Sequence, residues 1–112
     1  MIIMISSKQE DWNGAVEERF GRTPWLIKYD TESKKWEAFQ NPGASESGGA
    51  GIAAAQFVID KGATTVISGS FGPNASNTLK AANINMFVFT PDVTSVKHAI
   101  ELFEKGDLRS FA

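Results

Sequence analysis

The second half of the chain alternates helical and extended patterns, and this alternation restricts the possible folds more than any other feature. Two short apolar stretches, residues 64–68 and 85–89, are typical of strands. A helical pattern over residues 50–61 precedes the first of them and ends at Gly62, a residue that can adopt the left-handed conformation found at helix ends. Strands separated by helices pair in parallel through right-handed crossovers. The sequence therefore predicts an α/β fold, with further helices over residues 73–82 and 93–105.

The first half of the chain adds an N-terminal strand and a hairpin. Residues 2–6 form a continuous apolar run, as expected for a strand buried on both faces. Residues 25–29 and 35–40 are extended patterns separated by a short polar turn, so they should pair antiparallel. The polar connection over residues 7–23 is expected to contain a helical turn at residues 15–20. Together these segments predict one mixed five-stranded sheet with helices on both faces.

Size, charge and the lack of cysteine narrow the class of protein. A chain of 112 residues has room for one hydrophobic core, so we expect a single domain over residues 1–112. The absence of cysteine excludes disulfides and thiolate ligands. A net charge of −2 supplies no basic field and argues against a nucleic-acid partner. The apolar N-terminus lacks the basic region of a signal peptide and no segment is long enough to span a membrane, so we expect a cytoplasmic protein without a membrane partner.

The first of two glycine-rich turns spans residues 47–51. The segment Gly49-Ala-Gly-Ile-Ala-Ala54 fits the loose G-x-G-x-x-A pattern of dinucleotide sites, but a polar loop precedes it where that pattern requires a strand. Its glycines, Gly48, Gly49 and Gly51, lie at the start of a predicted helix, where unpaired N–H groups favour an anion. A purely structural turn explains these glycines equally well.

The second turn, residues 68–74, leaves a predicted strand and enters a predicted helix. Open α/β sheets usually bind their ligands at this position. Ser70 and Asn74 supply neutral hydrogen-bonding groups, and Gly72 exposes its backbone N–H. The turn lacks the lysine of a phosphate-binding P-loop, so nucleotide hydrolysis is not expected. A structural turn is again the alternative.

Among the charged residues outside the two turns, one is a good candidate for binding an anion. Arg22, just before the strand at residues 25–29, could hold an oxyanion through two parallel hydrogen bonds, and Arg19 is the weaker candidate of the pair. A solvated surface charge is the alternative for both. The single histidine, His98, is expected on the solvent side of its helix and cannot form a metal site alone. The acidic residues are dispersed, so no catalytic residues are assigned.

Three motifs along the chain resemble those of one known family. They are Phe20-Gly-Arg-Thr-Pro-Trp25, Gly48-Gly-Ala-Gly-Ile-Ala-Ala-Ala-Gln56, and Gly72-Pro-Asn-Ala75 followed by an apolar strand. In this order they resemble the dinitrogenase iron–molybdenum cofactor biosynthesis family, the small NifX-like domain that is also found at the C-terminus of NifB. The resemblance covers nearly the whole chain. It implies a ribonuclease H-like, three-layer α/β/α fold with a mixed five-stranded sheet.

The resemblance also implies a function. Members of this family are nitrogenase accessory factors that carry iron–molybdenum–sulfur clusters or their precursors, and they are not known chiefly as enzymes. Carried over by motif, the binding positions are Arg22, Gly48, Gly49, Gly51 and residues 72–74. Because the chain has no cysteine, the cluster would be bound non-covalently, by backbone N–H groups and Arg22 acting on its negative charge. An oxyanion is the other small ligand that this chemistry suits.

The alternative function is that of a protein-interaction module, which docks on a metalloenzyme and has no small ligand of its own. The aromatic residues of the hairpin, Trp25, Tyr29, Trp36 and Phe39, would form its contact surface. A hydrolase on a ribonuclease H-like sheet is not favoured, because residues 1–7 contain no carboxylate to bind a metal ion. The expected partners are thus a small anionic ligand or metal cluster, or a protein.

Overall fold

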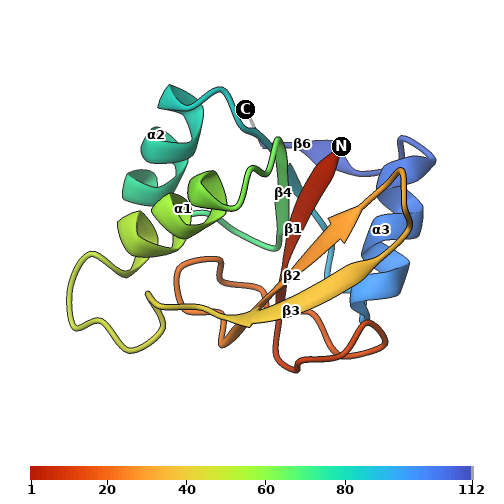
Figure 1. Cartoon of the computed structure of the whole chain (residues 1–112), viewed down its shortest axis with the longest axis horizontal. Helices are drawn as coiled ribbons and strands as arrows, with labels where there is room; N and C mark the ends of the chain where they lie inside the picture. The colour runs from red at the N-terminus through yellow and green to blue at the C-terminus, as the bar shows by residue number, and fades with distance from the viewer. Residues whose placement is uncertain (112) are drawn as a thin grey trace.

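The computed structural model describes residues 1–111. Its strands are β1 (Ile2–Ser7), β2 (Trp25–Asp30), β3 (Trp36–Gln40), β4 (Thr65–Ser68), β5 (Asn85–Val88) and β6 (Arg109–Ser110). Its helices are α1 (Ala50–Asp60), α2 (Pro73–Ala81) and α3 (Val96–Glu104). The strands form one sheet, with α1 and α2 together on one side of it and α3 on the other (Figure 1). Within the described residues, no helix has the length and hydropathy needed to cross a membrane.

Parallel pairing occupies the centre of the sheet, whose strand order is β3-β2-β1-β4-β5-β6. β4 pairs in parallel with β5, as the alternation of helices and strands in the second half of the chain predicts, and β1 pairs in parallel with β4. β2 and β3 form the expected antiparallel hairpin beside β1, with Tyr29 opposite Trp36. All three parallel strands end at the same edge of the sheet, so the segments that follow them lie close together.

Each face of the sheet carries its own hydrophobic core, because successive side chains along a strand point to opposite faces. On β1, Met4 belongs to the core under α1 and α2, whereas Ile3 and Ile5 belong to the core under α3. All three side chains are fully buried. From the helices, Ala54 and Leu79 pack into the first core and Val96 into the second. The two cores fix the helices at defined positions over the strands.

The sheet has six strands where the sequence predicted five. The additional strand, β6, contains two exposed residues and is too short for a hydrophobic pattern to reveal it. The three-layer α/β arrangement and the mixed sheet are confirmed. The ribonuclease H-like relationship stays a prediction.

The helical turn predicted at residues 15–20 is wrong. Val16 makes an isolated β-bridge to Ser7, and Arg19 makes another to Ser70. This segment is therefore largely extended, because its backbone groups pair with the ends of the sheet instead of with one another. Sequence pattern alone could not show this, since the pairing partners lie in distant parts of the chain.

α3 begins at Val96 and not at residue 93, where the apolar pattern placed its start. Ser95 precedes the helix in an extended conformation, and its hydroxyl accepts a hydrogen bond from the backbone N–H of His98 at 3.1 Å. This is the geometry of an N-cap. The capping serine therefore marks the start of the helix better than the apolar pattern does.

The long connection from β1 to β2 is fixed to the ends of the parallel strands. The hydroxyl of Ser6 donates to the carbonyl oxygen of Glu17 at 2.6 Å, and that of Ser68 donates to the carbonyl oxygen of Glu18 at 3.1 Å. The two hydroxyls are themselves 2.8 Å apart, so the single proton of Ser68 is shared between the hydroxyl oxygen of Ser6 and the carbonyl oxygen of Glu18. Gly69 packs directly on this connection, since a Cβ placed on it would lie 2.8 Å from the Cα of Glu18. The connection therefore leaves no room for a side chain at this glycine.

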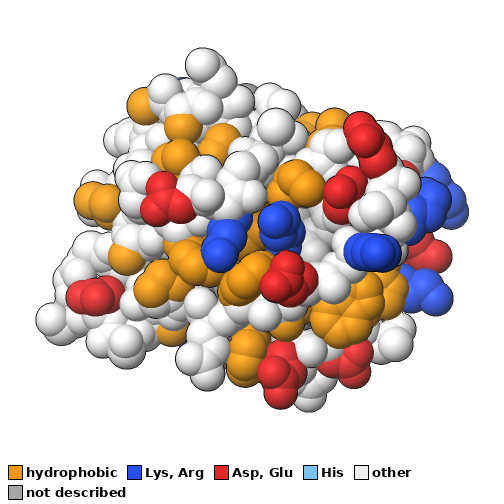
Figure 2. Space-filling model, in the orientation of Figure 1, with side chains coloured by type: hydrophobic (Ala, Val, Ile, Leu, Met, Phe, Trp, Pro, Cys, Tyr) orange, Lys and Arg blue, Asp and Glu red, His pale blue; other side chains and the backbone are white. Residues whose placement is uncertain are grey.

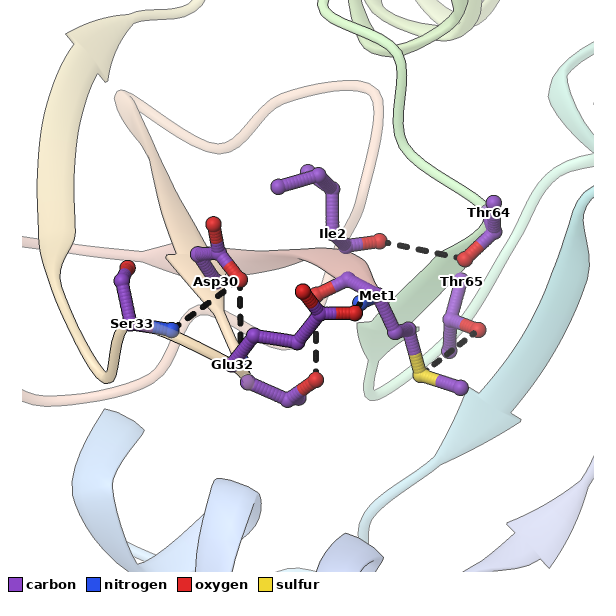
Figure 3. Close-up of polar contacts among 8 residues, drawn as sticks. Met1, Ile2, Asp30, Glu32, Ser33, Thr64 and Thr65 are labelled. Carbon is purple, nitrogen blue, oxygen red and sulfur yellow. Dashed lines mark hydrogen bonds and ion pairs between the residues drawn. The ribbon is translucent and has the colours of Figure 1, made fainter.

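At the amino end of β1, an ion pair and several hydrogen bonds link the N-terminus to the turn between β2 and β3 (Figure 3). The N-terminal ammonium group of Met1 lies 3.8 Å from a carboxylate oxygen of Glu32. Oδ1 of Asp30 accepts hydrogen bonds from the backbone N–H groups of Glu32 at 2.9 Å and Ser33 at 3.4 Å. These bonds, that from Glu32 above all, hold the pKa of Asp30 below its ordinary value. They stabilise the turn between β2 and β3. This turn lies at the opposite edge of the sheet from the carboxyl ends of the parallel strands.

The close contact at Gly69 gives a test of the fold. We expect Gly69→Ala to destabilise the protein by about 1–3 kcal/mol, because the added methyl group must displace backbone atoms of Glu18. Gly48→Ala is the matched control, since a Cβ there would meet no atom within 4 Å. Urea denaturation measures both free energies of unfolding. Equal values for the two variants would contradict the described path of the connection.

Candidate functional site

A pocket of about 440 Å³ opens beyond the carboxyl end of β4. It is lined by part of residues 19–22 and by residues 49–51 and 70–75. α1 and α2, which lie side by side in Figure 1, each contribute their N-terminus to it. Open α/β sheets usually bind ligands at this edge. The pocket is therefore the candidate functional site.

The N-terminus of α1 is placed by close contacts between glycines. Gly49 is the N-cap and has a left-handed conformation, with φ of 73°, and among residues 1–111 no side chain caps the helix. A Cβ on Gly51 would lie 3.2 Å from the Cβ of Ala75, and a Cβ on Gly21 would lie 3.1 Å from the Cα of Gly51. These contacts bring the three lining segments together. The first N–H groups of the helix have no intrahelical partner and point toward its N-terminal end.

The N-terminus of α2 is similar. Its N-cap, Gly72, is extended, and no side chain in the described part of the chain caps this helix either. Pro73 follows, and proline suits the first position of a helix because its missing N–H would be unpaired there. Neither α1 nor α2 has an acidic residue in its first turn. The partial positive charge at both helix N-termini is therefore not offset by a carboxylate within the first turn.

The third lining segment, residues 19–22, is here called the arginine strap. Phe20 anchors it, since its side chain is 1% exposed and its ring centroid lies 5.3 Å from that of Phe71. The two arginines at the ends of the strap both line the pocket. Nη1 of Arg22 donates a hydrogen bond to the carbonyl oxygen of Glu46 at 2.7 Å. Guanidinium groups carry five N–H donors, so this contact leaves donors for a ligand.

All but one of the residues that the sequence singled out line this pocket. They are Arg22, Gly49, Gly51, Ser70, Gly72 and Asn74. Gly48 does not line it and is exposed in the loop before α1. The role of these residues in binding stays a prediction.

The structure adds two lining residues that the sequence ranked low or missed. Arg19 lines the same pocket as Arg22, and Phe20 between them is buried. Gly21 is needed for the contact with Gly51. The Phe-Gly pair between two arginines was the only sign of these residues in the sequence. The contact of Gly21 with Gly51 could not be predicted from it, because the two residues are brought together only by the tertiary fold.

The chemistry of the pocket suits an anion. Of the residues that line it, only Arg19 and Arg22 carry charge, and both are positive. In residues 1–111, no group of three His, Cys, Asp or Glu side chains lies where it could hold a metal ion. His98 lies on α3, against the opposite face of the sheet. The pocket thus offers guanidinium groups and backbone N–H donors.

The aromatic side chains of the hairpin do not form one surface. Trp36 is 43% exposed on β3, while Tyr29 beside it is 5% exposed. Phe39 lies on the other face of the hairpin, with its ring centroid 5.7 Å from that of Phe57. Figure 2 shows the side of the molecule where β3 lies in front, and there hydrophobic side chains are interspersed with charges of both signs. The contact surface predicted from the sequence is divided between two faces.

Comparison with known proteins places the chain in a family. The family described as dinitrogenase iron-molybdenum cofactor matches residues 1–106. The apo form of the orange protein from Desulfovibrio gigas is 30% identical, with a TM-score of 0.92 over 99% of this chain and 92% of that one. A Thermotoga protein described provisionally as NifB is 33% identical, with a TM-score of 0.86 over 97% and 91% of the two chains. No curated protein matches the sequence. The chain therefore belongs to the dinitrogenase iron–molybdenum cofactor family.

Proposed function

We propose that this chain is a cytoplasmic, non-catalytic carrier of an anionic ligand: an iron–(molybdenum–)sulfur cluster, a precursor of one, or an oxyanion. One observation carries the proposal: two uncapped helix N-termini and two arginines converge on a single pocket that no carboxylate lines in residues 1–111. Membership of the dinitrogenase iron–molybdenum cofactor family supports the role of an accessory domain that binds a cofactor or cluster.

The electrostatics of the pocket favour a ligand with more than one negative charge. Each helix N-terminus acts as roughly half a positive charge within its first turn. Arg19 and Arg22, which line the pocket, add two full charges. The volume of about 440 Å³ falls within the range of roughly 300–1,000 Å³ that is typical of small-ligand sites. A neutral ligand of the same size would gain little from this arrangement.

The ligand would be held by its outer atoms and not through bonds from protein side chains to its metals. The chain has no cysteine, and the described residues contain no cluster of metal-binding side chains. Backbone N–H groups and guanidinium groups donate hydrogen bonds to oxygen or sulfur acceptors on the surface of such an anion. Because no metal–protein bond has to break, the ligand can leave intact, as a carrier requires.

Arg22 gives the first test. We expect Arg22→Ala to weaken the binding of molybdate or a thiomolybdate by about tenfold or more, since a hydrogen bond to a charged group contributes about 1.5–3 kcal/mol. Arg109→Ala is the matched control, because Arg109 lies on β6 and does not line the pocket. Anaerobic equilibrium dialysis measures the affinities. If Arg22→Ala and Arg109→Ala bind as tightly as each other, the proposed site is wrong.

Gly72 gives a second test, in which stability and binding should change in opposite directions. Gly72 is extended and a Cβ there would meet no atom within 4 Å, so Gly72→Asp should place its carboxylate as an N-cap of α2. We expect this variant to gain about 0.3–1 kcal/mol of stability and to bind molybdate more weakly, because the carboxylate occupies the anion site.

Gly72→Asn is the control for this second test. It caps the helix in the same way without adding charge, so it should retain more of the wild-type affinity. Thermal denaturation and dialysis measure the two quantities. Unchanged affinity in Gly72→Asp would show that the N-terminus of α2 takes no part in binding.

A further inference from the structure

Asn41 lies directly behind the pocket without lining it. It directly follows β3, it is 5% exposed, and it lies between the arginine strap and residues 42–49, the loop that leads into α1. No pattern in the sequence marks this residue. Its position between the two segments makes the partners of its side chain informative.

Every polar atom of the Asn41 side chain is used to join these segments. Nδ2 donates to the carbonyl oxygen of Thr23 at 2.9 Å and to that of Gly21 at 3.3 Å. Oδ1 accepts a hydrogen bond from the backbone N–H of Gly43 at 2.9 Å. The amide group therefore links two segments: its N–H groups bind the strap and the adjoining Thr23, and its oxygen binds the loop before α1.

Both tied segments pack directly on the first turn of α1. A Cβ on Gly43 would lie 2.4 Å from the carbonyl oxygen of Ala50, and a Cβ on Gly21 would lie 3.1 Å from the Cα of Gly51. These contacts stop either segment from moving closer to the helix, and the hydrogen bonds of Asn41 oppose their separation from each other. The amide of Asn41 thus sets the distance between the strap and the N-terminus of α1.

The hydrogen bonds of Asn41 also affect the position of Arg22. Arg22 lies between Gly21 and Thr23, the two residues whose carbonyl oxygens Asn41 holds. Its guanidinium group donates to the carbonyl oxygen of Glu46, which belongs to the loop on the acceptor side of the amide. The side chain of Arg22 is therefore hydrogen-bonded to the loop directly, and the backbone on either side of Arg22 is held to the loop through Asn41.

We propose that Asn41 is a positioning residue of the anion site, which holds Arg22 in register with the N-terminus of α1. The inference rests on the proposed function, because it assigns to Asn41 the geometry on which binding depends. A purely structural role would lower stability without any dependence on Arg22. The two roles therefore differ in whether the effect of Asn41 passes through the arginine.

The test variant is Asn41→Ser. A serine hydroxyl can still accept the hydrogen bond from Gly43, as in the turns that serine forms, but it is too short to hold the strap. We expect binding of molybdate or a thiomolybdate to weaken about tenfold, the size of effect that one such hydrogen bond supports. Asn85→Ser is the matched control, since Asn85 is exposed at the start of β5, away from the carboxyl edge.

A double-mutant cycle with Arg22→Ala separates positioning from general destabilisation. If Asn41 acts through Arg22, Asn41→Ser should change the affinity less than about twofold once Arg22 has been replaced. An equal loss in both backgrounds would overturn the positioning role, as would wild-type affinity in Asn41→Ser. Circular dichroism checks the fold of each variant.

The remaining outcomes of the experiment also decide the proposal. If Asn41→Ser fails to fold, Asn41→Thr, which keeps a neutral hydroxyl as acceptor for Gly43, replaces it in the same cycle; failure of both to fold would show that the amide serves the fold, and would overturn the inference. If the wild-type protein binds neither anion, the proposed function fails and the inference fails with it. Wild-type binding that is insensitive to Asn41 would overturn the inference alone.

Discussion

The parallel pairing of β1, β4 and β5 determines where this fold can bind anything. Helices that connect parallel strands run antiparallel to them, so α1 and α2 begin at the edge where the strands end. The edge thereby gathers backbone N–H groups that no neighbouring residue pairs. Close contacts among Gly21, Gly51 and Ala75 then bring the arginine strap against both helices. Larger side chains at the two glycines would separate the three segments and open the pocket.

The pocket presents two arginines and the N-terminal N–H groups of two helices, and among residues 1–111 no group of three His, Cys, Asp or Glu side chains lies where it could hold a metal ion. Backbone N–H groups are fixed in direction by the helices that present them, so they need little reorganisation when an anion arrives. The arginines are exposed, and Arg22 donates to the carbonyl oxygen of Glu46 while other N–H groups of its guanidinium remain for a ligand. Backbone N–H groups of fixed direction beside two exposed arginines suit reversible binding of a small anion, which is what we propose for this member of the family.

Sequence patterns predicted what depends on local periodicity, and missed what depends on distant partners. The parallel strands and the helices between them follow from hydrophobic spacing, and glycine at helix starts identified most of the pocket. Residues 15–20 were mistaken for a helical turn because their partners, Ser7 and Ser70 among them, lie elsewhere in the chain. β6 was too short to show a pattern. Asn41 gave no signal, since its importance lies in which carbonyl oxygens it reaches.

The central claim is that an anion sits between the N-termini of α1 and α2 beside Arg22. The most direct measurement is a titration of ¹⁵N-labelled protein with molybdate or a thiomolybdate, followed by NMR. The account predicts that the largest shifts fall on the backbone N–H groups of residues 50–52 and 74–75 and on the guanidinium group of Arg22. Shifts centred on another part of the molecule, or no shifts at millimolar anion, would contradict it.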